Sequence, residues 1–397
     1  MSGARSSWVG TFLVMAVVST VMATAIPGQA VSVEASAKSS VEASVEASGE
    51  VSGERFVRAR AEVVVGGLRN PRDVQVQADG SLLVAESGRG PATPCPPPAG
   101  VGRNRCLGFS GSLYRVAGSS KGRVLTGLPS QQINQNYGTS VLTRIGGAVQ
   151  AEAVGDGSYR ISYGLSGLPS DRAGLGVGSG PLGTLSTSGG AVLGDLAVHE
   201  LVHNPDAGNP GVTEVFSNPW GFAKDGQDFL VTDAGANDLV RVRPDGSTET
   251  VFAFPTNVRP TDNTPLQAVP TGIVRGQDGA FYIADMSGMH QGLSRIWRYV
   301  PGSTPTVFAS GLTDVIDLAV APGGDLIALS YGSGEPVNPG PGTLTRINAG
   351  TGATTPIPTT TSLKEPSGVA VTAQGDIYVT SNTQSNTDGV LLKFPAV

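Results

Sequence analysis

The sequence predicts an all-β fold, a six-bladed β-propeller built from four-stranded antiparallel blades. The main observation is an internal repeat, in which an alternating strand, a tight polar turn and a second alternating strand recur. Its turns carry pairs such as Asp79-Gly80 and Asp278-Gly279, which supply the positive φ that two-residue hairpin turns require. The copies span residues 71–86, 148–163, 219–233, 270–285, 315–330 and 366–381.

The remaining strands of each blade follow from the same pattern. A third strand is predicted at 112–116, 184–188, 238–242, 295–299, 343–347 and 390–394, and a fourth follows all copies but the last. An additional strand at 62–65 precedes the first copy, in a context similar to that of the fourth strands. We expect it to complete the last blade, because closing the ring protects the sheet edges. The alternative is an open β-sandwich, which would not repeat its turns in register.

Composition supports a turn-rich globular protein. The 397 residues include 56 Gly and 28 Pro, and charged residues make up 15%. A coiled coil would be richer in charged residues and Leu. The net charge of −6 leaves no basic excess to meet phosphates, so no nucleic-acid partner is expected.

The first 60 residues have the pattern of an export signal followed by a linker. A basic start, an uncharged apolar stretch and small-x-small cleavage sites at 23–25 and 28–30 predict a signal peptide over residues 1–30. An uncleaved anchor is the alternative, although the apolar run of about 18 residues is short for a membrane span. Residues 31–60 repeat Val-Glu-Ala-Ser, lack the apolar content of a folded segment and predict a disordered linker. We therefore expect a secreted, extracellular protein with no membrane span after cleavage and a propeller over 61–397.

The two cysteines lie in one Gly/Pro-rich stretch, PCPPPAGVGRNRC. In an exported protein, a disulfide between Cys95 and Cys106 is the expected state. Two cysteines without a nearby histidine make a poor zinc site.

One face of the predicted propeller carries all of the long loops. They lie at 87–111, 164–183, 257–269, 287–293 and 331–342, whereas the other face has only the tight turns. Because long loops on a rigid scaffold often carry function, we expect the binding site on this face.

Acids at the ends of second strands are the candidate ligands at this channel mouth. Glu86, Asp233 and Asp285 could converge on a hard cation such as Ca²⁺, joined by Asn237 or Asp317. The alternative, which we favour, is structural: each acid caps the backbone N–H groups of the next turn. A second column, of cations on the third strands, is interpreted as a solvated polar face rather than a ligand belt. It comprises Arg115, Arg241, Arg298, Arg346 and Lys393.

Residues 199–203, HELVH, match the HExxH pattern of zinc peptidases. That chemistry needs His199 and His203 on one face of a helix, with Glu200 positioning a zinc-bound water. Pro205 follows at once and would stop such a helix. We therefore expect a strand or short helical turn at the blade edge, without zinc. Glu200→Gln is then expected to act as a surface change, within about 0.5 kcal/mol.

Residues 203–255 resemble the ScyD/ScyE family, which is named for its association with the biosynthesis of a cyanobacterial sunscreen pigment. The matching residues are Asn204-Pro205-Asp206, Asn218-Pro219, Asp233-Ala234-Gly235, Asn237 and Pro244-Asp245-Gly246. The resemblance implies an exported six-bladed propeller with NHL-like repeats, and it supplies no catalytic residues. Membership would not by itself imply an enzyme.

These observations favour a monomeric propeller that binds a small molecule or a protein through its long-loop face, without catalysis. The first alternative is a lactonase-like hydrolase with a metal in the central channel. It requires Glu86, Asp233 and Asp285 within coordination reach of one another. The second, less favoured, is the zinc peptidase.

Overall fold

The structure is a computed structural model that describes residues 60–335 and 339–396. Antiparallel strands make up most of this part of the chain. Short helices occur in the connections: α1 (Pro169–Gly174), α2 (Leu196–His203) and the 3-10 turn η1 (Ser287–Met289). None of the helices in the described ranges has the length and apolar character needed to cross a membrane. The predicted signal peptide and linker lie outside the described residues, except for Arg60.

Four sheets contain four strands each, as the repeat predicted. The first has β10 (Pro219–Asp225), β11 (Asp228–Asp233), β12 (Asp238–Val242) and β13 (Thr248–Ala253). The second has β16 (Pro270–Arg275), β17 (Phe281–Asp285), β18 (Ser294–Tyr299) and β19 (Thr306–Leu312). The third has β20 (Val315–Val320), β21 (Leu326–Ser330), β22 (Thr343–Ile347) and β23 (Thr354–Ile357). The fourth has β24 (Gly368–Val371), β25 (Ile377–Ser381), β26 (Gly389–Phe394) and β1 (Glu62–Leu68).

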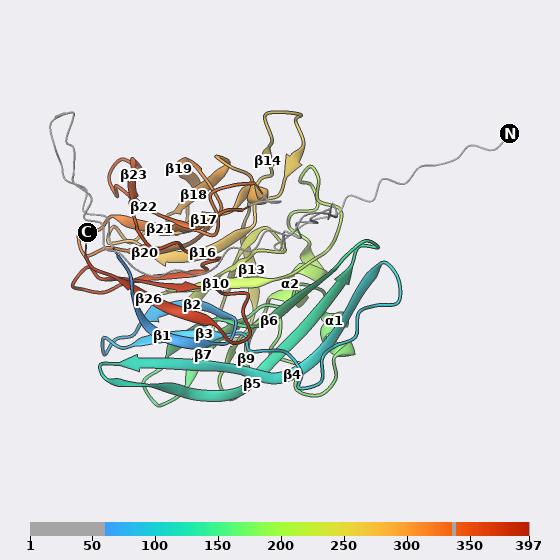
Figure 1. The fold of residues 1–397 in the computed structure, drawn as a ribbon. Helices are drawn as coiled ribbons and strands as arrows, with labels where there is room; N and C mark the ends of the chain where they lie inside the picture. Colours follow the sequence, from blue (N-terminus) through green and yellow to red (C-terminus); the bar gives the residue numbers. More distant parts are fainter. Residues whose placement is uncertain (1–59, 336–338, 397) are drawn as a thin grey trace, which may run out of the picture.

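The first two repeats form one eight-stranded sheet. Its members are β2 (Pro71–Val76), β3 (Leu82–Glu86), β4 (Gly102–Ala117), β5 (Ser120–Asn136), β6 (Val141–Ala153), β7 (Tyr159–Tyr163), β8 (Thr184–Thr187) and β9 (Val192–Asp195). The sheet is continuous because β5 and β6 extend well beyond the repeat, and residues 130–136 of β5 pair with residues 141–147 of β6. The long green strands of Figure 1 show this ribbon. Part of the predicted loop at 87–111 is strand, because β4 begins at Gly102. The number of blades stays a prediction.

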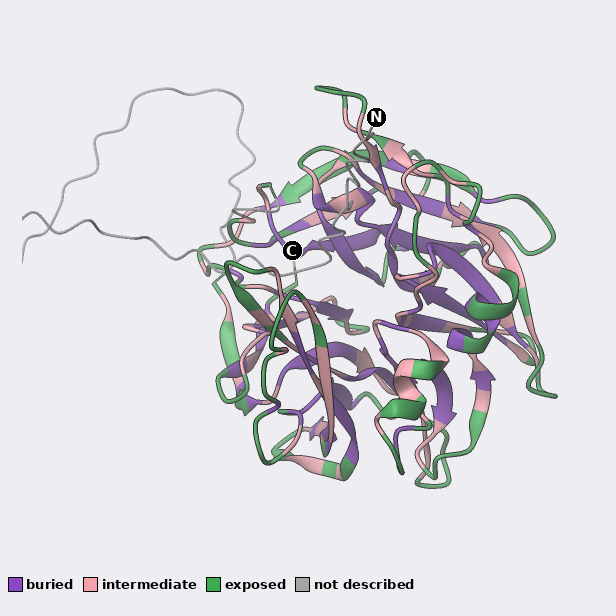
Figure 2. Ribbon diagram, turned by 90° about the vertical axis from the view of Figure 1, so that its right-hand side faces the viewer, coloured by how far each residue is buried: buried purple, intermediate pink, exposed green. Residues whose placement is uncertain are grey.

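The sheets surround a common centre. Their first strands contact one another in a closed circle, in the order β2, β6, β10, β16, β20, β24 and back to β2. Figure 2 shows the buried strands innermost and the exposed segments at the rim. The hydrophobic clusters lie between neighbouring sheets; one, for example, joins Ile296 of β18 to Leu318 of β20. This arrangement of antiparallel sheets is that of a β-propeller.

The additional N-terminal strand closes the ring, as predicted. β1 pairs antiparallel with β26, placing Glu62 opposite Lys393 and Leu68 opposite Gly389. Leu68 is fully buried and packs in a cluster with Leu391 and Val74. The first and last described strands are thus held together by both hydrogen bonds and apolar packing.

The column of cations on the third strands binds the tight turns. Arg115 pairs with Asp79, Arg298 with Asp278 and Lys393 with Asp376. Arg241 pairs with Asp225 and Asp228, and Arg346 with Asp325. The exposed pairs, such as Arg115 with Asp79, contribute only a few tenths of a kcal/mol to about 1 kcal/mol each, whereas the pairs of Arg241 are partly buried. Their place at the turns, on the face opposite the long loops, argues against a ligand belt.

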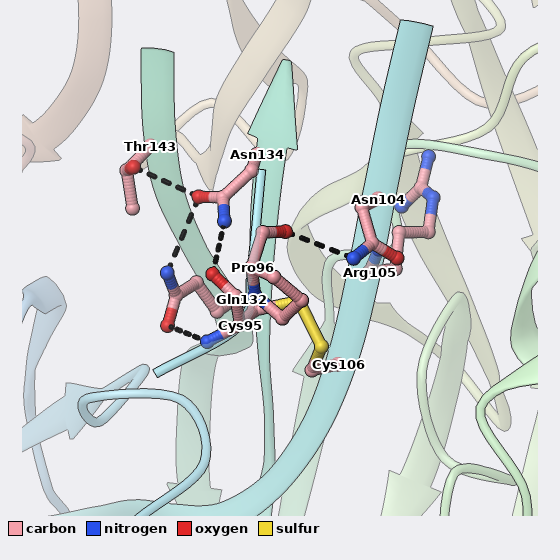
Figure 3. The surroundings of a disulfide bond; sticks show 8 residues. All are labelled: Cys95, Pro96, Asn104, Arg105, Cys106, Gln132, Asn134 and Thr143. Atoms are coloured by element: carbon pink, nitrogen blue, oxygen red, sulfur yellow. Dashed lines mark hydrogen bonds between the residues drawn. A yellow bond between two sulfur atoms is a disulfide. The ribbon is translucent and has the colours of Figure 1, made fainter. Parts of the chain in front are cut away.

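The predicted disulfide between Cys95 and Cys106 is present, with 5.5 Å between the Cα atoms. It fastens the loop before β4 to the long β4–β5 ribbon (Figure 3). The same loop is held by two side chains of β5. The amide of Asn134 donates to the Cys95 carbonyl at 2.5 Å, and the Cys95 N–H donates to Gln132 Oε1 at 3.2 Å.

Replacing both cysteines with alanine is expected to loosen this loop and to leave the propeller folded. Entropic models assign about 3 kcal/mol to a bridge that closes a loop of this size. The bridged segment lies in the connection from β3 to β4 and the start of β4, within one sheet, so the other sheets should be unaffected. Limited proteolysis should therefore cut within residues 91–101 much faster in the variant, with a small change in melting temperature. Reduction of the unmodified protein should reproduce the effect. A loop that stays equally resistant would contradict this prediction.

Candidate functional site

A pocket lies where the inner strands end on the long-loop face. Its lining comes from several sheets, as expected for a pocket on the propeller axis. The space within it that no atoms fill is about 760 Å³, including the open solvent at its mouth. Its walls are mainly apolar, and none of the lining residues is acidic. They are Arg72, Ser87, Ile133, Arg144, Ile145, Gly146, Gly147, Val149, Gly164, Ser166, Phe216, Asn218, Trp220, Ala234, Val269, Thr271, Met286 and Gln384.

The pocket is lined by the residues that follow the predicted acids. Ser87, Ala234 and Met286 line it, whereas Glu86, Asp233 and Asp285 do not. Consecutive side chains of a strand point to opposite sides, so the acids turn away from the pocket. The pocket thus lies on the face predicted from the sequence, and its lining includes the residue after each predicted acid instead of the acid itself.

Each of these acids is held by donors near its own strand. Glu86 accepts from the backbone N–H of Arg69, the hydroxyl of Ser112 and two nitrogens of Arg123, the latter both at 2.7 Å. Asp285 accepts from the backbone N–H of Ser287 at 2.8 Å and from the Trp297 indole at 2.9 Å.

Asp233 is held in the same way. It accepts from the Ser217 hydroxyl and from the backbone N–H groups of residues 218, 235 and 236. This is the capping arrangement favoured from the sequence. Within the described ranges, no group of three or more His, Cys, Asp or Glu side chains is placed to hold a metal. Glu86, Asp233 and Asp285 are therefore not brought together as a calcium site.

The two further candidates also have protein partners. Asn237 donates to Asp206 at 2.7 Å and to Gln267 at 2.9 Å, and its carbonyl oxygen accepts from the Val269 N–H. Asp317 accepts from the Val369 N–H at 2.7 Å and hydrogen-bonds to the carboxyl group of Asp73. Burial raises the pKa of both Asp73 and Asp317 and so disfavours two negative charges at this pair.

The pocket contains two arginines with different surroundings. Arg72 is buried and donates to Ser87 Oγ at 3.2 Å and to the Ile145 carbonyl at 2.7 Å. Arg144, on β6, has its Nε and Nη2 atoms buried without a hydrogen-bond partner. Burial lowers the pKa of each to about 10, and both remain cations at neutral pH. The sequence analysis missed Arg144, because it lies outside the repeat in the extended β5–β6 ribbon.

The HELVH residues form helix α2, and Asn204 ends it in the left-handed conformation at φ 41° just before Pro205. The structure thus has an eight-residue helix where a strand or short helical turn was expected. Both ring nitrogens of His199 are hydrogen-bonded, Nδ1 to Thr248 at 2.9 Å and Nε2 to Thr250 at 2.8 Å. Burial lowers the pKa of His199 to about 4. His199 therefore serves as a neutral structural side chain between α2 and β13.

Glu200 belongs to a buried group of acids, not to the surface, which corrects the expectation above. It is 1% exposed, Asp206 is 2% exposed and Asp238 is fully buried. Oε2 of Glu200 and both carboxyl oxygens of Asp238 lack partners. Burial raises the pKa of Glu200 to about 8 and of Asp206 to about 6, and it raises that of Asp238 strongly. Burial thus favours the neutral form of both Glu200 and Asp238.

Comparisons with known proteins add little to this picture. No family model matches the sequence, and no curated protein matches it. Similar solved structures include a protein of unknown function from Bacteroides thetaiotaomicron, at 9% identity and a TM-score of 0.49, covering 84% of this chain and 72% of that one. A gluconolactonase from Xanthomonas campestris is 12% identical with a TM-score of 0.48, covering 86% and 91%. Virginiamycin B lyase from Staphylococcus aureus is 11% identical with a TM-score of 0.44, covering 84% and 99%. At these values the assignment of fold depends on the sheets themselves.

Proposed function

We propose that this protein is an exported β-propeller of the ScyD/ScyE type that binds a small molecule in its axial pocket, without catalysing a reaction on it. The observation that carries the proposal is the pocket lining. Apolar side chains from several sheets meet there with a few polar groups, which is the usual composition of a small-molecule site. A rigid propeller holds such a pocket ready before binding, which lowers the entropic cost of association.

The lining residues support binding more than hydrolysis. None of them is a carboxylic acid, histidine or cysteine, and general acid–base catalysis usually needs such a group within hydrogen-bonding reach of the substrate. The acids nearest in sequence, such as Glu86 and Asp285, are held by Arg123 and Arg295 instead.

The test fills the pocket with a single side chain. Gln384 is half-buried at the pocket, whereas Gln374 is exposed in a tight turn of the same sheet, on the opposite face. A small-molecule library would be screened by thermal stabilisation of the full chain. Compounds that stabilise the unmodified protein are expected to lose their effect on Gln384→Trp and to keep it on Gln374→Trp. Equal stabilisation of both variants would place binding elsewhere and reject the proposal.

Metal analysis of the purified chain separates this proposal from the lactonase-like alternative. One equivalent of tightly held calcium, with turnover of a lactone that stops on its removal, would support the metal-dependent hydrolase. One equivalent of zinc that is lost from a His199→Ala/His203→Ala variant would support the peptidase. The binding proposal expects neither result, because Glu86, Asp233 and Asp285 have protein partners and both ring nitrogens of His199 are hydrogen-bonded.

A further inference from the structure

Arg144 lines the axial pocket, and one edge of its guanidinium group is buried without a protein partner. The Nε–H and one Nη2–H of an arginine point in the same direction and form a fork that matches the two oxygens of a carboxylate. These are the two nitrogens of Arg144 that are buried without partners. A buried donor without a partner costs free energy, and a buried charge without an opposite charge costs more.

Among the residues that the structure describes, no acid forms an ion pair with Arg144. The ionisable groups that act on Arg144 are Tyr137, Arg103, Tyr331 and Arg72, and none of them is a carboxylate. Arg72 cannot take the role of the ligand-binding group, since it is already bonded to Ser87 and to the Ile145 carbonyl. In the part of the chain that the structure describes, Arg144 therefore offers a positively charged donor pair that no protein group uses.

The rest of the lining suits an apolar, planar body. Trp220 and Phe216 line the pocket together with Met286. The guanidinium of Arg103 lies 5.4 Å from the centre of the Phe216 ring. Aromatic faces prefer to contact other rings or flat cations. A ligand that satisfies both parts of the pocket has an aromatic body and a single anionic end.

We propose that the ligand class is an aromatic or similarly apolar carboxylic acid, whose carboxylate binds side-on to Nε and Nη2 of Arg144. This inference rests on the proposed function, because it takes the axial pocket as the binding site. Arg144 would then determine that the pocket prefers ligands with a carboxylate.

Titration of the full chain at neutral pH with 3-phenylpropionate and its neutral amide tests the inference. Hydrogen bonds to a charged group are worth about 1.5–3 kcal/mol, so the acid should bind about ten- to a hundred-fold more tightly than the amide. Arg144→Gln should reduce the affinity for the acid to that for the amide, and Arg144→Lys should restore part of it. Arg243→Gln, which removes an exposed arginine paired with Glu249, is the control and should change neither.

The outcomes distinguish this inference from the proposed function. If acid and amide bind equally well, and both are lost in Gln384→Trp, the pocket binds ligands but the carboxylate assignment is wrong. If inorganic phosphate binds as tightly as the acid and depends on Arg144, the site recognises oxyanions in general and the assignment is also wrong. Absence of any binding of the acid at millimolar concentration overturns it as well.

A ligand-free measurement gives an independent check. Arg144→Met should raise the melting temperature of the empty protein, because it removes two buried charged donors that lack partners. Arg72→Met should lower it, because that change breaks the bonds to Ser87 and Ile145. If both variants are destabilised to the same extent, Arg144 has a structural role and the inference fails.

Discussion

Deleting residues 1–67 is expected to abolish stable folding, whereas deleting residues 1–54 is expected to leave the propeller intact. The longer deletion removes nearly all of β1 (Glu62–Leu68), which pairs with β26 along its length. It exposes the edge of β26 and the apolar side chains that packed against Val65. An open ring also weakens the contact between β2 and β24, the inner strands of the first and last repeats.

Melting curves and solubility of the two truncated proteins would measure this effect. The longer deletion should give an aggregated protein or a melting temperature lower by tens of degrees, since several kcal/mol are a large part of a protein's total stability. A milder variant, Val65→Asp, places a charge in the same buried cluster and should be destabilised in the same direction. Equal melting temperatures for the two deletions would show that β1 does not close the ring.

Glu200→Gln is expected to stabilise the protein at alkaline pH. Burial raises the pKa of Glu200 to about 8 in the folded state, against about 4.3 in an unfolded chain. The unfolded chain therefore loses this proton first as the pH rises. The contribution of protonated Glu200 to the free energy of unfolding is complete below about pH 4.3. Above this pH it falls by about 1.4 kcal/mol per pH unit, and it is lost once the pH passes the folded pKa of about 8. Glutamine does not ionise, so the variant lacks this loss.

Urea denaturation at pH 5 and pH 8.5 would measure the difference. The variant should resemble the unmodified protein at pH 5 and be more stable by a few kcal/mol at pH 8.5. Glu214→Gln is the matched control, because Glu214 is exposed and its replacement should have little effect at either pH. A stability gap that does not change with pH would show that Glu200 is ionised throughout this range.

The architecture could be predicted because its signals are local. Apolar residues two apart, as at Phe281 and Ile283, mark strands, and the Asp-Gly pairs mark hairpin turns whose glycines have positive φ, such as 80° at Gly279. The closing strand was predicted from its similarity to the fourth strands of the repeat, and the Cys95–Cys106 bond from two nearby cysteines in a chain with an export signal. These features depend on short stretches of sequence or on the compartment expected for the protein.

The pocket could not be predicted from alternation, because tertiary pairing sets which side chains reach the axis. The pairing of inner strands shifts register near their start, between Pro71 and Val74 in β2 and between Pro270 and Ile273 in β16. A shift of one residue reverses the side of the sheet on which each side chain lies.

Arg144 is the clearest case of a property decided by tertiary structure. The sequence determined that it would be charged, and the pairing of Arg144 with Ile133 across β5 and β6 decided where that charge lies. It lines the axial pocket together with Arg72, Phe216 and Trp220, which come from three other parts of the chain. Glu200 differs from the sequence expectation for the same reason, since the segment around Phe216 and the strand bearing Asp238 enclose it. Burial is a sum over contacts distant in sequence, so only the folded chain specifies it.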